Sequence, residues 1–315
     1  MEQRQLGRTG LFVSAVGLGC NNFGGRVDQA GTQRVVDAAI DAGINFFDTA
    51  DVYGNQLSEV MLGKALGSRR HDVVVATKFG MPTGDGALAK GGSRRYVIKA
   101  AEASLKRLGT DYIDLYQMHF PDVHTPLAET LGALDDLVRA GKVRYVGHSN
   151  FSGWQIADAH WLAAQAGSAP MVTAQNHYSL LERAIRHEVI PACEHFGVGI
   201  LPYFPLGSGM LTGKYRRDEP PPQGTRLANM GNLAARAMSD RAFSLVEALS
   251  EYTHAQGRDL LTLAFSWLLS QPIISSVIAG ATSPEQVAGN VAAAGGWRLG
   301  PDEMQDVDKI LGSVA

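Results

Sequence analysis

Four ionisable side chains of four different types lie near the ends of three successive apolar segments. Asp48 and Tyr53 come at the end of the first segment, Lys78 at the end of the second and His119 at the end of the third. If these segments are parallel strands, their carboxyl ends meet at one edge of a sheet. A carboxylate, a phenol, an ammonium and an imidazole then converge there. This set suits proton transfer to a carbonyl oxygen.

Each of the four side chains has a role in that chemistry. Tyr53 would protonate the carbonyl oxygen, although a free tyrosine, with a pKa of about 10, is a weak acid at neutral pH. We expect the Lys78 ammonium to lower the pKa of Tyr53, and Asp48 to pair with Lys78. His119 would orient the carbonyl by a hydrogen bond. Any one of the four could instead cap, pair or pack, but their convergence at consecutive strand ends favours catalysis.

Strand-like and helix-like segments alternate along the chain and would position these side chains. Eight strand-like segments begin near Val13, Asn45, Val73, Tyr112, Val143, Met171, Val198 and Ile274. Amphipathic helices are predicted between them, after the capping residues Ser93, Ser152 and Ser239 and over residues 125–141. A hairpin with Gly in its turn is predicted over residues 4–13.

Eight strand–helix units predict an α/β fold, a (β/α)8 TIM barrel. We expect a single domain over residues 1–315, with an N-terminal β-hairpin and extra C-terminal helices. A doubly wound sheet is disfavoured, because the residues after Gly17 and Gly19 do not open a helix as a dinucleotide fingerprint requires. Two irregular insertions, 81–92 and 207–229, follow strands and would lie at the C-terminal face, where barrel active sites form.

The composition excludes several other classes of protein. The chain is 45% hydrophobic and 19% charged, with a net charge of −3, and no dense basic stretch suggests nucleic acid or an anionic membrane. No apolar run approaches the roughly 20 residues of a membrane helix, and the N-terminus has no signal core. Two distant cysteines fit a reducing compartment. We therefore expect a cytoplasmic protein.

Metal-dependent hydrolysis on the same barrel is the main competing chemistry. It normally needs several His or carboxylate ligands at strand ends. Of the nine histidines, only His119 and His148 fall clearly at such positions, and no His-x-His pair occurs. No Gly-x-Ser-x-Gly nucleophile elbow has the required setting either. No metal site is predicted.

The chain resembles the aldo-keto reductases from end to end. The matching stretches are residues 47–54, 76–80, 117–119, 147–151, 174–176, 203–209 and 277–282. Residues 211–215 and 283–287 are similar to a bacterial branch that includes relatives of the potassium-channel β subunit. The resemblance implies a TIM barrel, an NAD(P)(H) molecule extended across its C-terminal mouth, and reversible interconversion of a small carbonyl compound and its alcohol.

The resemblance also implies cofactor contacts at individual positions. Ser149, Asn150 and Gln175 match contacts of the nicotinamide carboxamide, and Tyr203 matches the aromatic ring that stacks on the nicotinamide. Positions that match contacts of the phosphates and the adenosine are Leu206, Ser208, Lys214, Gly280, Thr282, Ser283, Gln286 and Asn290. The sequence adds that Ser283 would cap a helix, whose N-terminus favours phosphate.

One departure from the family pattern concerns the choice of cofactor. Many relatives that prefer NADPH have Lys or Arg near position 282, where this chain has Thr282. Arg226, in the long insertion, could supply the charge for the 2′-phosphate. We expect NADP(H), with NAD(H) as the open alternative.

The substrate pocket above the nicotinamide is expected to be aromatic and neutral. Its candidate residues are Phe23, Phe79, Phe120, Phe151 and Met210. Such a pocket fits aldehydes and uncharged ketones better than acids. Two alternative functions stay open: a cofactor-binding regulatory subunit, and a sugar or alcohol dehydrogenase that works oxidatively. The sequence predicts neither the physiological substrate nor the oligomeric state.

Overall fold

A computed structural model describes residues 1–229 and 231–313. Within these residues, eight parallel strands form one sheet in the order β10, β3, β4, β5, β6, β7, β8, β9. Their bounds are β3 Val16–Gly19, β4 Phe46–Asp48, β5 Val74–Phe79, β6 Ile113–Met118, β7 Val143–Ser149, β8 Met171–Gln175, β9 Gly199–Ile200 and β10 Val277–Gly280. Main-chain hydrogen bonds from Ser275 N to Ile200 O (2.9 Å) and from Ile278 N to Pro202 O (3.0 Å) join the two outer strands. The sheet is therefore a closed barrel, as predicted.

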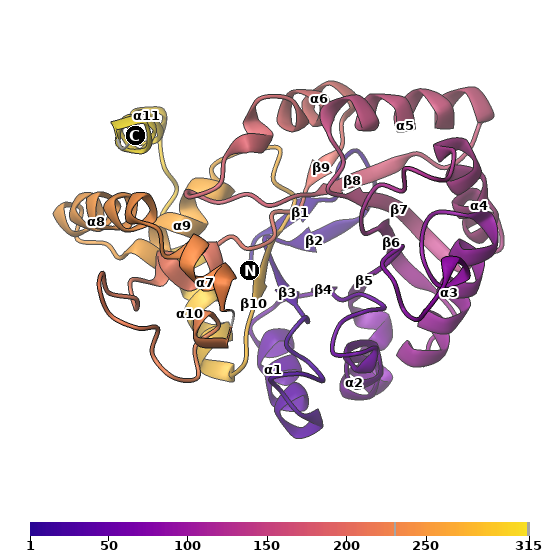
Figure 1. Cartoon of the computed structure of the whole chain (residues 1–315), viewed down its shortest axis with the longest axis horizontal. Helices are drawn as coiled ribbons and strands as arrows, with labels where there is room; N and C mark the ends of the chain where they lie inside the picture. Colours follow the sequence, from indigo (N-terminus) through magenta and orange to yellow (C-terminus); the bar gives the residue numbers. More distant parts are fainter. Residues whose placement is uncertain (230, 314–315) are drawn as a thin grey trace.

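Helices surround the strands on the outside of the barrel (Figure 1). Those that follow the strands are α1 Gln29–Asp41, α2 Leu57–Leu66, α3 Arg94–Leu108, α4 Leu127–Arg139, α5 Gly153–Ala166, α6 Val189–Phe196, α9 Leu260–Leu269 and α10 Pro284–Gly295. Further helices are α7 Asn232–Ala237, α8 Asp240–Ala255 and α11 Pro301–Ser313, the last of which packs beside α8. Short helical turns are η1 Gly67–Asp72, η2 Ala87–Ala89, η3 Ala184–Arg186, η4 Gly207–Thr212 and η5 Leu227–Asn229. Extra C-terminal helices were expected; among the described residues one helix, α11, follows the eighth unit.

Serine caps fix where several of these helices begin. Ser93 Oγ accepts a hydrogen bond from Tyr96 N at the start of α3, and Ser239 and Ser283 cap α8 and α10 in the same way. Helix α3 ends at Leu108 and is followed by Gly109, which adopts φ +65°, a conformation that favours glycine. The predicted apolar face of α3 is buried, at Val97, Ala101, Leu105 and Leu108.

The N-terminal hairpin closes one end of the barrel. Strands β1 (Gln3–Gln5) and β2 (Phe12–Ser14) are antiparallel, with Arg4 opposite Val13. Leu6 and Val13 pack with the first residues of the barrel strands, including Phe46. Because those residues lie at the N-terminal ends of the strands, the hairpin plugs that end. The opposite end is left for a functional site.

Two expected strand boundaries are corrected. Val13 belongs to the hairpin, because Ala15 N still donates to Glu2 O (2.9 Å), and the first barrel strand begins at Val16. The last barrel strand begins at Val277 and not at Ile274, because Ile274 forms an isolated bridge with Ile200 at the seam of the barrel.

The alternation of side chains along each strand decides what occupies the C-terminal end. Phe46 on β4 and Leu115 on β6 belong to the small core inside the barrel. Two residues further along these strands, Asp48 and Gln117 face the same interior. On β5 the first residue, Val74, faces the interior, and Lys78, four residues later, therefore faces it too. Polar side chains therefore lie inside the barrel on the C-terminal side of its small apolar core.

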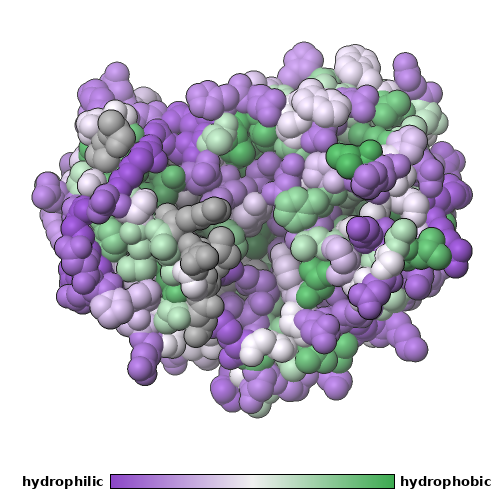
Figure 2. Space-filling model, in the orientation of Figure 1, coloured by the Kyte–Doolittle hydropathy of each residue, from purple (hydrophilic) through white to green (hydrophobic). Residues whose placement is uncertain are grey.

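The face of the molecule that Figure 2 shows is mainly hydrophilic. On the face shown in Figure 2, hydrophilic side chains cover most of the surface and hydrophobic ones gather in small, separate patches. Within residues 1–229 and 231–313, no helix is both long enough and apolar enough to cross a bilayer.

Candidate active site

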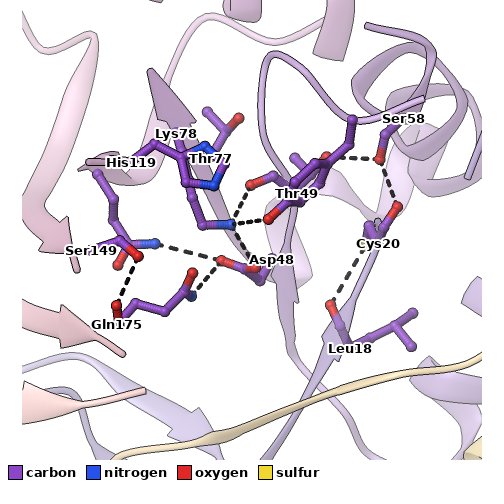
Figure 3. A network of polar contacts seen from close by, with 12 residues as sticks. Leu18, Cys20, Asp48, Thr49, Ser58, Thr77, Lys78, His119, Ser149 and Gln175 are labelled. Atoms are coloured by element: carbon purple, nitrogen blue, oxygen red, sulfur yellow. Dashed lines mark hydrogen bonds and ion pairs between the residues drawn. The ribbon is translucent and has the colours of Figure 1, made fainter. Parts of the chain in front are cut away.

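The Lys78 ammonium lies at the centre of a buried polar cluster at the C-terminal end of the barrel (Figure 3). Its Nζ donates to Asp48 Oδ2 (2.7 Å), to Thr49 O (2.9 Å) and to Tyr53 OH (3.3 Å). The Lys78 side chain is fully buried and that of Asp48 is 4% exposed. Three acceptors match the three donors of an ammonium group, so Lys78 is held in one orientation beside the Tyr53 hydroxyl.

The charges in this cluster are mutually dependent. Burial alone would lower the pKa of Lys78, but the Asp48 carboxylate, and then Tyr53, raise it above its usual value. Burial raises the pKa of Tyr53, and the Lys78 ammonium opposes this shift only in part. The expected lowering of the Tyr53 pKa is therefore wrong for this structure. Tyr53 keeps its proton at neutral pH, the state that a general acid needs.

His119 presents a neutral ring beside Tyr53. The two rings are 5.7 Å apart between centroids and nearly perpendicular. Burial, and then the Lys78 ammonium, lower the pKa of His119 to about 3. Its Nδ1 has no hydrogen-bond partner among the described residues. A neutral imidazole has one N–H donor, so His119 can make a single directed hydrogen bond to a substrate oxygen.

The residues matched to the nicotinamide carboxamide lie together at the ends of β7 and β8. Ser149 Oγ donates to Gln175 O (2.7 Å), and Asn150 Nδ2 donates to Ser149 Oγ (3.0 Å). Tyr203 OH donates to Asn150 Oδ1 (2.8 Å). Gln175 Nε2 donates to Asp48 Oδ1 (2.9 Å), which joins this group to the cluster around Lys78. The structure thus brings all four residues to the same end of the barrel as the catalytic candidates.

The loop after β9 has an unusual backbone conformation, and the Lys214 side chain lies against it. Ser208 and Gly209 have φ values of +58° and +97° within η4. A Cβ atom at Gly209 would lie 3.1 Å from Lys214 Nζ, so the lysine side chain crosses this glycine closely. Leu206, at the start of the loop, packs against the main core.

The turn between β10 and α10 is tied together by Gln286. Its Oε1 accepts hydrogen bonds from Thr282 N (2.9 Å) and from Thr282 Oγ1 (3.2 Å). Gly280 ends β10 and is exposed, whereas Asn290, one helical turn beyond Gln286, is buried. Ser283 Oγ accepts from Gln286 N, as a helix cap does. Thr282 and Gln286 therefore bond to each other in this structure.

Arg226 lies against an aromatic ring in the long insertion. Its guanidinium carbon is 4.4 Å from the ring centroid of Phe204. Burial, and then the charge of Arg26, lower the pKa of Arg226. Arg26 in turn donates from Nη2 to Gly224 O (2.7 Å), so two arginines meet where the insertion approaches the loop after β3.

The candidate pocket residues divide into two groups. Phe23, Phe79, Phe151 and Met210 are at most 2% exposed and belong to the core outside the barrel. Phe120 is 47% exposed, and its ring stacks on His119 with centroids 5.5 Å apart. These four side chains pack against other core residues, and their place in a substrate pocket stays a prediction. Phe120 borders open space beside His119.

Gln117 lies in the polar cluster, but it was not among the candidates named from the sequence. Its Nε2 donates to Asp48 Oδ1 (3.5 Å), and its Oε1 accepts from Thr173 Oγ1 (3.2 Å). Two glutamines, Gln117 and Gln175, therefore contact the same oxygen of Asp48. Its position two residues before His119, on the same face of β6, was the signal that could have identified it.

Asp51 is a buried acid between Asp48 and Tyr53. It is 1% exposed, and neither carboxyl oxygen has a hydrogen-bond partner among the described residues. Burial, and then the nearby Glu59 carboxylate, raise the pKa of Asp51 to about 7. Glu59 is itself paired with Arg107 Nε (2.6 Å). Asp51 is therefore a neutral acid over most of the acidic range.

Asp51→Asn is expected to remove a pH dependence of stability. Since the pKa of about 7 lies above the unfolded value of about 3.9, protonated Asp51 favours the folded state at low pH. That contribution, on the order of 4 kcal/mol, is lost progressively as pH rises from about 4 to about 7. The variant should therefore gain stability relative to the wild type over the same range in thermal unfolding. A difference that stays constant with pH would contradict this, and Asp41→Asn, at an exposed site, is the control.

His148 is a core residue by its surroundings. Its ring is fully buried, stacks on Phe151 at 4.5 Å, and has no hydrogen-bond partner among the described residues on either nitrogen. Burial lowers the pKa of His148 to about 3. In the part of the chain that the structure describes, no group of three His, Cys, Asp or Glu side chains could hold a metal ion.

The chain is similar to known proteins along most of its length. The model of the aldo/keto reductase family matches residues 15–312. The chain is 39% identical to the uncharacterized oxidoreductase YrpG of Bacillus subtilis, over 93% of this chain and 91% of the relative. It is 38% identical, with the same coverage, to a probable voltage-gated potassium channel subunit beta of Oryza sativa. It is 33% identical to the aldo-keto reductase YhdN of Bacillus subtilis, over 99% of this chain and 94% of the relative.

Proposed function

Because this chain belongs to the aldo/keto reductase family, a family of oxidoreductases, we propose that it reduces aldehydes and ketones to alcohols with NADP(H). In this proposal Tyr53 is the general acid. The main support is the buried Lys78 ammonium, which lies 2.7 Å from Asp48 Oδ2 and 3.3 Å from Tyr53 OH. No other described cluster combines a charged, oriented ammonium with a protonated phenol at the barrel mouth.

The side chains of the site would share the work of moving one proton. Ser149, Asn150, Gln175 and Tyr203 would hold a reduced nicotinamide, which when bound would provide the hydride for the carbonyl carbon. Tyr53 gives its proton to the carbonyl oxygen, and the Lys78 ammonium stabilises the phenolate that remains. Asp48 keeps Lys78 charged and aimed, and the neutral His119 ring donates a hydrogen bond that orients the carbonyl oxygen.

The residues at the barrel mouth are compatible with an extended dinucleotide. Ser149 and Gln175 offer polar groups beside Asp48 for a carboxamide, and Tyr203 offers an aromatic face. The close approach of Lys214 to Gly209 leaves backbone and ammonium together, which suits a phosphate. At the other end, the capped N-terminus of α10 offers a second place for negative charge.

Arg226→Ala is expected to raise the dissociation constant of NADPH about 10-fold, and that of NADH by less than about 2-fold. The reason is loss of a guanidinium proposed to contact the 2′-phosphate, which only NADPH has. Fluorescence titration with both nucleotides measures the two constants. Arg216→Ala, an exposed arginine of the same insertion, is the control. Equal weakening of both nucleotides would exclude Arg226 from the 2′-phosphate site.

The proposed substrates are uncharged aldehydes and ketones with an aromatic or apolar group. Phe120 is the observation that supports this, because its partly exposed ring stacks on His119 at the barrel mouth. A flat apolar surface beside the reacting oxygen favours neutral substrates over acids. The physiological compound is a matter for a substrate screen.

A second candidate is a cofactor-binding regulatory subunit. It is favoured by the 38% identity to a plant protein named as a probable voltage-gated potassium channel subunit beta. Tyr53, Lys78, Asp48 and His119 are all present and lie together, which favours an enzyme over a purely regulatory subunit. Turnover of a range of carbonyl compounds separates the two, because a purely regulatory subunit would bind nucleotide with little or no turnover.

The proposed setting is a reducing cytosol. Both cysteines, Cys20 and Cys193, are free and buried.

The direction of the reaction in the cell depends on the ratio of reduced to oxidised cofactor, because one site serves both directions. Incubation with oxidised NADP and an alcohol or sugar measures the oxidative alternative.

A further inference from the structure

A cavity of about 540 Å³ lies between the N-terminal part of α1 and the turn before α10. Its lining includes Arg26, Asp28, Gly31, Arg34 and, from the opposite wall, Thr282. Helices α1 and α10 are neighbours on the outside of the barrel (Figure 1). The cavity therefore adjoins the capped N-terminus of α10, but its charged side chains come from a different segment of the chain.

The two arginines of this cavity have no carboxylate partner among the described residues. Arg26 donates to a main-chain oxygen, Gly224 O, and no hydrogen bond or ion pair within those residues involves the Arg34 guanidinium. The one acid in the lining, Asp28, accepts from Gly31 N (2.8 Å) as the cap of α1. By contrast, Arg69, which lies outside the cavity lining, is paired: its Nη2 is 2.6 Å from Oδ1 of Asp37 on α1. Positive charge therefore exceeds negative charge in the cavity.

Arg226 extends this group of positive charges. The charge of Arg26 is, after burial, the largest cause of the lowered pKa of Arg226, so these guanidinium groups repel one another across the insertion. Repulsion among unpaired guanidinium groups is relieved when an anion binds between them. The planar guanidinium group of arginine can bind a phosphate through two parallel hydrogen bonds, as it can a carboxylate.

Thr282 supplies no positive charge to the opposite wall. Its N–H and its hydroxyl both donate to Gln286 Oε1. If a phosphate binds beside Thr282, its countercharge must come from the α1 wall. Arg34 and Arg26 are the cations on that wall.

We propose that Arg34 and Arg26 bind the 2′-phosphate of NADP(H) and so determine the preference of this chain for NADP(H) over NAD(H). This inference rests on the proposed function, because it places one end of the proposed cofactor. It differs from a clamp by residues of the β10–α10 turn, since Arg26 comes from the loop before α1 and Arg34 from α1 itself, with Arg226 of the long insertion as a further cation beside Arg26.

Calorimetry with 2′,5′-ADP and with 5′-AMP tests the proposal without any turnover. Both probes have the adenosine and a single 5′-phosphate, and only 2′,5′-ADP has the 2′-phosphate. The wild type should bind 2′,5′-ADP about 10-fold more tightly than 5′-AMP. Arg34→Ala should remove most of this preference, Arg26→Ala should reduce it, and Arg34→Glu should reverse it. The same variants should raise the dissociation constant of NADPH about 10-fold with little change for NADH.

Arg8→Glu is the matched control for the change of charge. Arg8 lines a cavity of about 600 Å³ near Gly197, beside the N-terminal hairpin at the other end of the barrel. It should leave the affinity for both probes unchanged. Because Arg34 is exposed, thermal unfolding of its variants should match the wild type.

Two results would overturn the inference while leaving the proposed function intact. One is a wild type that turns over carbonyl compounds but binds both probes equally. The other is an Arg34→Glu variant that keeps the wild-type preference for the 2′-phosphate. Failure of the proposed function has a different signature: neither NADPH nor NADH binds, and no carbonyl compound is turned over.

Discussion

Tyr53→Phe is expected to lower kcat for carbonyl reduction by about 100- to 10,000-fold, the usual contribution of a general acid. The phenylalanine ring fills the same space, but it has no proton to give to the carbonyl oxygen. The dissociation constant of NADPH should change by less than about 2-fold, because the residues proposed to bind the cofactor are unaltered. Steady-state reduction of an aldehyde and fluorescence titration with NADPH measure the two effects.

Tyr112→Phe is the control for this substitution. Tyr112 precedes β6, lies beside His71 and is far along the strand from the catalytic candidates. It should leave kcat unchanged. If Tyr53→Phe keeps full turnover, Tyr53 is not the acid and the proton must come from another group.

Lys78→Met is expected to destabilise the fold by about 3–5 kcal/mol, because it leaves the Asp48 carboxylate buried without its partner. The pair is held at 2.7 Å, and both side chains are almost inaccessible to water. Urea unfolding at neutral pH measures this loss. Turnover should fall as well, since no cation then stabilises the phenolate of Tyr53.

The double variant Lys78→Met with Asp48→Asn separates stability from catalysis. Removing the unpaired carboxylate should restore part of the lost stability, because a neutral amide costs less to bury than a charge. Turnover should not recover. A single variant Lys78→Met that is as stable as the wild type would show that Lys78 and Asp48 are not a buried pair in solution.

The barrel was predictable because each strand–helix unit has its own local signals. The helix that begins after Ser93 shows this, since the serine cap and the apolar spacing agree on its start and its buried face. The boundaries at Val13 and Ile274 were not predictable, because they depend on contacts between distant segments: the hairpin pairing with Glu2 and the seam at Ile200.

The convergence of Asp48, Lys78 and His119 followed from parallel strands that end at one edge. The pocket was harder to predict, because proximity in sequence does not fix which face a side chain takes. Phe79 follows Lys78 directly, so the alternation along β5 turns it toward the helices, where it packs on Tyr116 with ring centroids 4.7 Å apart. The raised pKa of Tyr53 also depends on burial, which no single strand end reveals.

The most direct test of the proposed reductase activity is fluorescence titration of the wild type with NADPH and with NADH, followed by turnover of a nitro-substituted benzaldehyde. We expect tight binding of NADPH, weaker binding of NADH, and oxidation of NADPH that depends on the aldehyde. Binding without turnover on a range of carbonyl compounds would contradict the reductase proposal and favour a regulatory subunit. Absence of binding of either nucleotide would contradict the proposed cofactor site as a whole.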